Sequence, residues 1–167
     1  MEESPGVGLN LGCGHVRWPG WVNVDLKGGD LRCDIRDLDV LPADHADAVA
    51  AIHVLEHFHA WETPDILTEW RRVLKPGGKL ILELPCIDKV LNHIYQCMQQ
   101  GLELTPTMTW HVFWGNPKYR NEFMVHKWGY TKNSLKETLE AAGFRDVTFE
   151  RPRYHFEIRD MRAIAFK

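Results

Sequence analysis

The sequence predicts a single α/β domain built on a mostly parallel sheet. Three observations predict this fold class: strand-like and helix-like segments alternate, no repeat or linker divides the 167 residues, and two strand-like segments come last with no helix between them. About one domain is expected at this length, so residues 1–167 are treated as one unit. The two final segments are expected to form an antiparallel edge of the sheet.

The composition is that of an ordinary globular protein. Hydrophobic residues make up 44% and charged residues 26%, which excludes a disordered or fibrous chain. The net charge of −3 gives no global positive field to hold nucleic acid or an anionic membrane. No apolar run approaches the roughly 20 residues of a membrane span, and the acidic N-terminus carries no apolar signal segment. We therefore expect a cytoplasmic protein, without nucleic-acid or membrane partners, in which the four cysteines stay reduced.

Four strands are expected in the first half of the chain. Residues 7–11 form a short strand that ends in a glycine turn at 12–14. Residues 21–25 alternate apolar and polar positions, and residues 31–33 form a weak third strand. Residues 46–52 are apolar enough to be buried on both faces of a sheet.

A helix and a buried strand follow. Thr63 is a suitable N-cap and Pro64 suits the first helical position, so a helix begins here. The run Lys75-Pro-Gly-Gly78 ends it. Residues 79–84, Lys-Leu-Ile-Leu-Glu-Leu, are the clearest buried strand in the chain.

A second helix is expected from Asp88 to the glycine at position 101, where glycine favours a helix end. The apolar residues at helical spacing are expected to face inward: Val90, Leu91, Ile94, Tyr95 and Met98.

The last part of the chain holds an aromatic segment, a helix and two strands. Residues 102–130 show no clear period and hold many aromatic rings, so we expect either a cover over a substrate pocket or a secondary core beneath a loop. A helix follows with Thr131 or Asn133 as its N-cap. Residues 147–150 and 162–166 are the two final strands.

The strongest local signal is the glycine turn that ends the first strand. Gly12 and Gly14 allow positive φ and let a ligand lie against bare backbone. In a parallel sheet this is where nucleotide-like ligands bind, although a simple tight turn explains two glycines equally well. Asp25 ends the second strand, where a carboxylate accepts hydrogen bonds from a ribose diol; the alternative is a turn residue. It lies 11 residues after Gly14, and Arg17 stands where a third glycine would be, which disfavours a dinucleotide site.

Asp34 follows the third strand. A carboxylate there accepts a hydrogen bond from an adenine amino group, with Ile35 against the ring; the alternative is a solvated turn aspartate in an acidic stretch.

Taken in order, these segments resemble the class I S-adenosylmethionine-dependent methyltransferases, particularly the small type 11 group. The resemblance implies a Rossmann-like class I methyltransferase sheet with helices on both faces, S-adenosyl-L-methionine as cofactor, and methyl transfer to a small-molecule acceptor. The matching segments are residues 9–14, 22–25, 33–35, 47–57, 69–84 and 130–144.

The resemblance also implies a cofactor site. Backbone around Gly12 and Gly14 would approach the methionine part, Asp25 would bind the ribose, and the segment at His53 would pass beside the amino acid part or methyl group. Adenine would lie against Leu26 and be held by the pair that follows the third strand. The implied cofactor-binding residues are Asn10, Gly12, Cys13, Gly14, Asp25, Leu26, Asp34, Ile35 and His53.

Two departures from the family pattern stand out. Asn10 occupies a position where the family usually has an acid, so attraction to the cofactor's ammonium is lost. Only six residues separate Gly14 from Trp21, where the family usually places a helix, so Arg17 or His15 is left to meet the cofactor carboxylate. These departures keep a second function open: a non-catalytic binding module that retains the fold. A nucleic-acid methyltransferase ranks last, because residues 52–55 lack the expected Asn/Asp-Pro-Pro-aromatic motif.

Three histidines are candidate catalytic bases: His53, His57 and His126. His53 and His57 are four residues apart, a spacing that suits metal ligands on a helix. However, the run Leu55-Glu-His57 resembles the family's usual segment that holds no metal, so no metal site is predicted.

Overall fold

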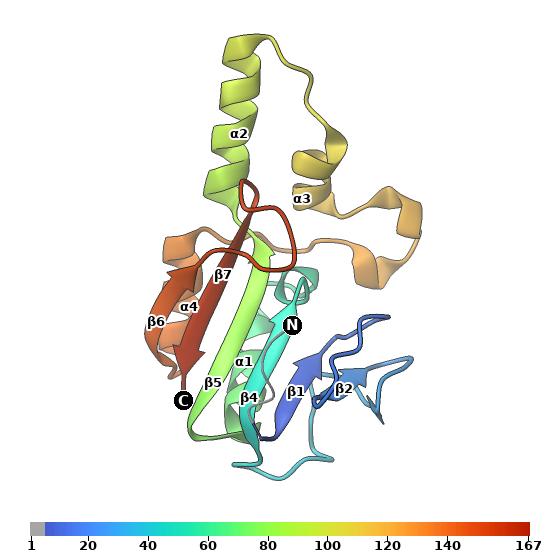
Figure 1. The fold of residues 1–167 in the computed structure, drawn as a ribbon, viewed down its shortest axis with the longest axis vertical. Coiled ribbons are helices and arrows are strands. Elements are labelled where there is room, and N and C mark those ends of the chain that lie inside the picture. The colour runs from blue at the N-terminus through green and yellow to red at the C-terminus, as the bar shows by residue number, and fades with distance from the viewer. Residues whose placement is uncertain (1–5) are drawn as a thin grey trace.

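A seven-stranded mixed sheet forms the centre of the protein (Figure 1). The computed structural model describes residues 6–167. The strand order is β3-β2-β1-β4-β5-β7-β6, and β7 alone runs antiparallel to its neighbours β5 and β6. This confirms the mostly parallel sheet with antiparallel pairing at one edge. The strands are β1 (Gly8–Leu11), β2 (Val22–Asp25), β3 (Leu31–Arg32), β4 (Ala46–Ile52), β5 (Leu74–Pro85), β6 (Arg145–Glu150) and β7 (Asp160–Phe166).

Helices occupy the places that the sequence predicts, but the first begins at Thr63, so Glu62 rather than Thr63 is its N-cap and Pro64 is its second residue. Thr131, rather than Asn133, is the N-cap of the last helix, because its hydroxyl accepts from the backbone N–H of Ser134 in a reciprocal capping box. Within residues 102–130 the chain forms one short helix and several 3₁₀ turns. The helices are α1 (Thr63–Val73), α2 (Ile87–Gln100), α3 (Trp110–Trp114) and α4 (Lys132–Ala141), and the 3₁₀ turns are η1 (Leu55–His57), η2 (Pro106–Met108), η3 (Pro117–Tyr119) and η4 (Glu122–Met124).

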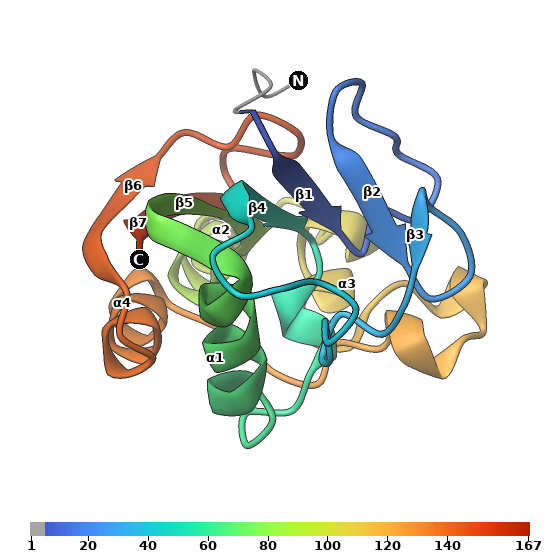
Figure 2. The ribbon, with the colours of Figure 1, turned by 90° about the horizontal axis from the view of Figure 1, so that it is seen from below.

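The two faces of the sheet are covered differently (Figure 2). Helices α1 and α4 lie on one face, where Leu67 and Trp70 of α1 are buried in the larger core. The opposite face carries no helix among the described residues, and loop aromatics cover part of it: Trp18, Trp21 and Tyr154. The expectation of helices on both faces is therefore met on one face only. The connection between Gly14 and Trp21 is too short for a crossover helix, as expected, and it is irregular.

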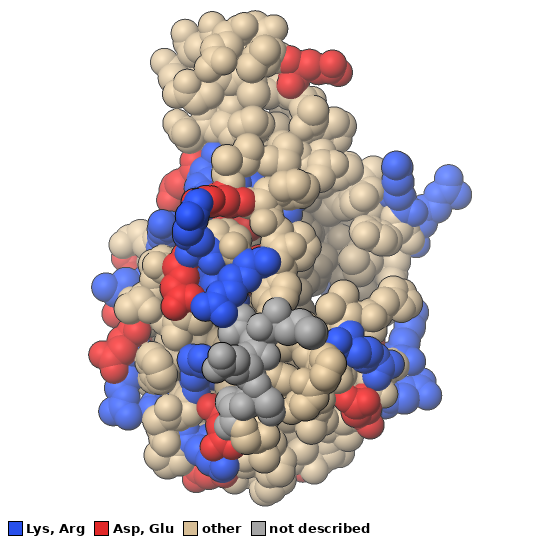
Figure 3. All heavy atoms as spheres, viewed as in Figure 1, with Lys and Arg blue, Asp and Glu red and all other residues tan. Residues whose placement is uncertain are grey.

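Helix α2 does not bury the stripe that its sequence suggested. Val90 is fully buried, but Leu91, Tyr95 and Met98 are 53–68% exposed. The reason is its position: α2 projects beyond the carboxyl edge of the sheet instead of packing on a face (Figure 1). The surface around it carries few charges, whereas charges of both signs mix over the rest of this side (Figure 3).

The topology brings the carboxyl ends of the parallel strands to one edge. The glycine turn after β1, Asp25 of β2 and His53 after β4 therefore meet there. The segment that carries η4 lies over the same edge. Of the helices described, none has the length and apolar character needed to cross a membrane. All four cysteines are free thiols, as expected.

Candidate functional site

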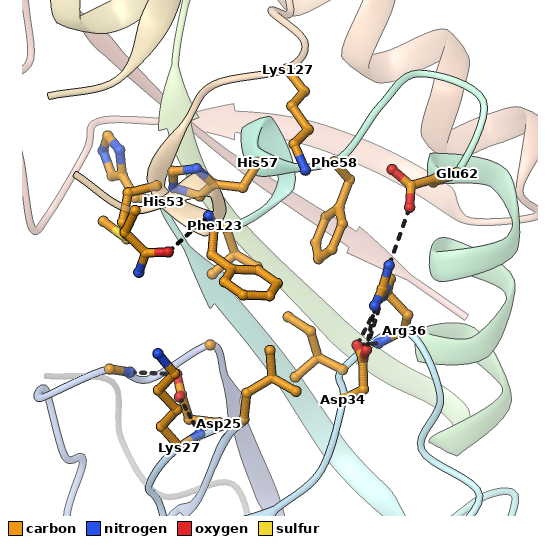
Figure 4. A pocket seen from close by; sticks show the side chains of 17 residues that line it. Asp25, Lys27, Asp34, Arg36, His53, His57, Phe58, Glu62, Phe123 and Lys127 are labelled. Carbon is orange, nitrogen blue, oxygen red and sulfur yellow. Dashed lines mark hydrogen bonds and ion pairs between the residues drawn. The ribbon is translucent and has the colours of Figure 1, made fainter. Parts of the chain in front are cut away.

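A cavity of about 320 Å³ opens at this edge (Figure 4). Asp25 and Lys27 lie on one side of it. Arg36, with its ion-pair partners Asp34 and Glu62, lies on another side. His53, His57 and Lys127 lie across from them. The remaining lining is largely apolar. The lining residues are Gly12, Gly14, Asp25, Leu26, Lys27, Asp34, Ile35, Arg36, His53, Val54, His57, Phe58, Glu62, Asn121, Phe123, Met124 and Lys127.

The glycine turn and Asp25 form one connected unit. Gly12 and Gly14 both have positive φ, at +64° and +52°. The backbone N–H of Gly14 donates to Oδ2 of Asp25 at 3.0 Å, and the N–H of Lys27 donates to Oδ1 at 3.0 Å. Each carboxylate oxygen therefore keeps lone-pair capacity for another donor. A Cβ atom at Gly14 would meet nothing within 4 Å, so bare backbone faces open space.

Asp34 is more heavily engaged than Asp25. Arg36 binds both of its oxygens through the guanidinium, at 2.6–3.1 Å, and also donates its backbone N–H at 2.9 Å. These hydrogen bonds hold the pKa of Asp34 below its ordinary value. Three N–H groups of Arg36 thus engage the two oxygens of the carboxylate. Ile35 and Leu26 lie beside it as apolar lining.

Two implied cofactor residues do not line the cavity. Asn10 is buried, and its amide donates to Val16 O at 3.1 Å and to Asn23 Oδ1 at 3.0 Å. It therefore fastens the loop between Gly14 and Trp21 to the sheet. Cys13 is also buried and does not line the cavity; burial raises the pKa of its thiol.

His53 sits at a strained point between acidic groups. Its φ is +52°, uncommon for a residue other than glycine, while its backbone N–H donates to Glu83 O at 2.7 Å. Its Nδ1 lies 2.9 Å from Oε1 of Glu56, and its Nε2 lies 3.6 Å from Oδ1 of Asp160. Burial alone would lower the pKa of His53, but the two carboxylates outweigh it and raise that pKa. The charged imidazolium is favoured, which does not suit a general base.

Glu56 is buried beneath the three candidate histidines. Burial alone would raise the pKa of its carboxyl, but His53 outweighs burial and lowers it to about 2. The backbone N–H groups of Lys127 and Trp128 donate to the carbonyl of Glu56 at 2.8 and 3.2 Å. This contact draws the segment after η4 onto the edge of the sheet.

His57 and His126 lie on either side of Glu56. His57 lines the cavity, and its Nδ1 lies 3.1 Å from Val125 O. His126 lines a smaller neighbouring cavity, with Nδ1 2.8 Å from Val112 O and its ring centre 4.9 Å from that of His57. Burial lowers the pKa of His126, which favours the neutral imidazole.

Several lining residues carry no motif of their own. Arg36, Phe58 and Glu62 come from loops beside the matched segments, and their only signal was proximity to a strand end. Asn121, Phe123, Met124 and Lys127 come from the aromatic segment 102–130, which the sequence marked only as a possible cover. Arg17 does not line the cavity; its guanidinium lies 3.5 Å from Asp30.

The chain is similar to known methyltransferases in sequence and in fold. Residues 22–82, somewhat over a third of the chain, match the family model of the methyltransferase domain. No curated protein is significantly similar to it in sequence. The model match and the shared fold confirm the resemblance to class I methyltransferases drawn from the motifs.

Three solved structures illustrate the likeness. An S-adenosylmethionine-dependent methyltransferase from Archaeoglobus fulgidus has a TM-score of 0.65 and 18% identity over 96% of this chain and 86% of its own. The 1,6-didemethyltoxoflavin N1-methyltransferase of Burkholderia thailandensis, solved with S-adenosylhomocysteine, has a TM-score of 0.64 and 19% identity; the match covers 98% of this chain and 71% of that one. A possible histamine N-methyltransferase from Thermotoga maritima has a TM-score of 0.62 and 16% identity; the match covers 100% of this chain and 84% of that one. At such identities the likeness shows the fold.

Proposed function

We propose that this chain, which has the fold of the class I methyltransferases, transfers a methyl group from S-adenosylmethionine to a small-molecule acceptor. One observation carries the proposal: Asp25 and the open backbone of Gly14 face a largely apolar cavity at the carboxyl edge of the sheet. This is the edge at which open α/β sheets bind nucleotides.

The residues present fit an adenosyl cofactor. Asp25 retains acceptor capacity for the two ribose hydroxyls, and Gly14 offers backbone without a side chain in the way. Leu26 and Ile35 supply apolar contact for a purine ring. Since Arg36 occupies the oxygens of Asp34, we assign the ring to these apolar contacts and leave Asp34 as a neighbour that positions Arg36.

The bound cofactor supplies a methyl group on a positively charged sulfur, which is reactive without further activation. The protein's task is then to align the acceptor and exclude water. Phe58 and Phe123 are apolar walls suited to water exclusion (Figure 4).

An acceptor hydroxyl or ammonium must also lose a proton. His57 lies on the cavity wall, and His126 is close behind it with its neutral form favoured. Its two carboxylate neighbours raise the pKa of His53, which makes it the weaker candidate for this step. We therefore assign proton removal to His57, with His126 as the second candidate and His53 as a charged neighbour.

The proposal is tested by titrating the protein with S-adenosylhomocysteine, using Asp25→Ala and the exposed control Asp37→Ala. We expect binding to the parent protein and a stabilisation of about 2.7 kcal/mol at a hundredfold excess over Kd. Loss of hydrogen bonds to a charged carboxylate should weaken binding to Asp25→Ala by about 1.5–3 kcal/mol and leave Asp37→Ala unchanged.

Equal affinities in the two variants would remove Asp25 from the site. No heat and no shift in Tm at millimolar ligand would favour a non-catalytic binding module instead.

A further inference from the structure

Glu56, His57 and His126 converge on one point beside the proposed cofactor cavity. Each contributes a side-chain donor atom, and these three atoms lie within 4.8 Å of one another. Donor atoms bound to a transition metal at about 2.1 Å lie roughly 3–3.5 Å apart, so side-chain movements of about 1 Å would close the set. The three residues come from two segments that the backbone already joins, through the N–H of Lys127 and the carbonyl of Glu56.

The Glu56 side chain is the buried centre of this cluster. It is only 2% exposed, and Oε2 of its carboxylate makes no hydrogen bond with any residue from 6 to 167. The imidazole of His53 is its charge partner, with Nδ1 2.9 Å from Oε1, whereas Oε2 has no partner among these residues. A buried carboxylate oxygen without a hydrogen bond is costly, so Oε2 is the atom that a bound cation would satisfy.

The two imidazoles are oriented as metal ligands usually are. Nδ1 of His57 faces the carbonyl of Val125, and Nδ1 of His126 faces the carbonyl of Val112. A carbonyl can only accept, so each Nδ1 carries the proton and each Nε2 keeps a lone pair. Metal-binding histidines characteristically donate their other N–H to a carbonyl or carboxylate in this way, which fixes the tautomer.

We propose that Glu56, His57 and His126 form a binding site for a divalent transition metal ion. Two imidazoles and one carboxylate are the ligand set of catalytic zinc sites and of non-haem iron(II) sites, which keep further positions open. The nitrogen ligands favour such ions over Mg²⁺ and Ca²⁺, which prefer oxygen.

The position of the site gives the ion a specific use. His57 lines the larger cavity and His126 the smaller one, so the ion lies between the two. An acceptor that presents an oxygen atom from the side of the smaller cavity would be held by the open metal positions. With the ion bound, Nε2 of His57 and Nε2 of His126 are ligands and no longer accept a proton, so the ion would take over the activation of the acceptor oxygen. This consequence rests on the proposed function, whereas the metal site does not.

The site is tested by titrating tag-free, chelator-treated protein with Co²⁺ and Zn²⁺ in the absence of S-adenosylhomocysteine. The readouts are the visible absorption of bound Co²⁺, its displacement by Zn²⁺, and the rise in Tm. We expect one equivalent to bind, with affinity at least about a hundredfold weaker in Glu56→Gln and in His126→Gln. The matched control His45→Gln, at the opposite edge of the sheet, should bind as the parent protein does.

Two results would overturn the proposal: no Co²⁺ binding at millimolar concentration, or binding that survives both Glu56→Gln and His126→Gln. If Glu56 served only as a structural partner of His53, Glu56→Gln would lower Tm equally with and without metal. A separate titration of the chelator-treated protein with S-adenosylhomocysteine keeps the two proposals distinguishable. Metal binding without cofactor binding would refute the proposed function and leave the metal site standing.

Discussion

At the residue scale, two buried glutamates show how differently one side chain is accommodated. Glu83 of β5 is fully buried but accepts backbone N–H donors from Arg153, Tyr154 and His155 at 2.9–3.0 Å. The Glu56 side chain is buried to a similar degree, but its only near partner among the described residues is the His53 ring at 2.9 Å, and its Oε2 has none. The first arrangement secures the loop before β7 onto the bare face of the sheet. The second leaves one carboxylate oxygen beside the cavity without a hydrogen bond, which is uncommon for a buried side chain.

Glu83→Gln is expected to lower the free energy of unfolding by roughly 3 kcal/mol at pH 7, because the guanidinium of Arg162, 1% exposed and 3.6 Å from Glu83, loses its charged partner. Burial alone would raise the pKa of Glu83, but hydrogen bonds from the 153–155 loop lower it below 4.5. The carboxylate thus stabilises the fold above pH 4.5, and this contribution is lost as pH falls through the lowered pKa. Urea unfolding at pH 7 and pH 3 should show the gap between parent and variant narrowing in acid.

The exposed Glu103→Gln should show no gap at either pH. A Glu83→Gln deficit that is constant from pH 7 to pH 3 would mean that the carboxylate charge is not what holds the loop.

At the element scale, the turn after β1 depends on two glycines for different reasons. At Gly12 an added Cβ would come within 2.7 Å of Val54, whereas at Gly14 it would meet nothing within 4 Å. Gly12 therefore serves packing between β1 and the segment after β4. Gly14 keeps backbone open toward the cavity.

Alanine at these two positions should separate stability from binding. Gly14→Ala carries only the positive-φ strain of about 1–2 kcal/mol, but its methyl group enters the ligand space. Gly12→Ala adds a clash worth about 1–3 kcal/mol, so it should lower Tm further. Thermal unfolding and S-adenosylhomocysteine titration measure the two effects. The assignment fails if Gly14→Ala binds as the parent protein does, or if it is the less stable of the pair.

At the scale of the whole molecule, the sheet is protected by helices on one face and by loop aromatics on part of the other. The Trp18 side chain is 3% exposed, meets Trp21 edge-on at 5.0 Å and stacks on Tyr154 at 5.1 Å. These rings cover the small residues Ala48 and Ala50. The short connection between Gly14 and Trp21 thus covers this face of the sheet with aromatic rings, where a crossover helix would otherwise pack.

Trp18→Ala should cost about 3–5 kcal/mol of unfolding free energy, since a buried aromatic ring is removed. The control residue Trp61 is 73% exposed, so Trp61→Ala should change the free energy of unfolding by less than about 0.5 kcal/mol. Chemical denaturation of both variants makes the comparison. Similar midpoints would show that the second face needs no cover.

The sequence determined the order of strands and helices, the glycine turn and the position of Asp25, because local patterns report local structure. It also predicted the missing helix between Gly14 and Trp21, which follows from length alone. It misjudged α2, since an apolar stripe at residues 90–98 indicates a helix but not what lies against it.

Only the tertiary structure decided what surrounds each site residue. Asn10 lies within a segment that resembles the cofactor motif, yet its side chain donates to Asn23, and the carboxylate of Asp34 is engaged by Arg36, two residues away. Glu56 and His126 are 70 positions apart and meet because β4 ends where the segment after η4 crosses the edge of the sheet. Contacts between distant segments depend on where the chain is routed over the sheet, which no local pattern records.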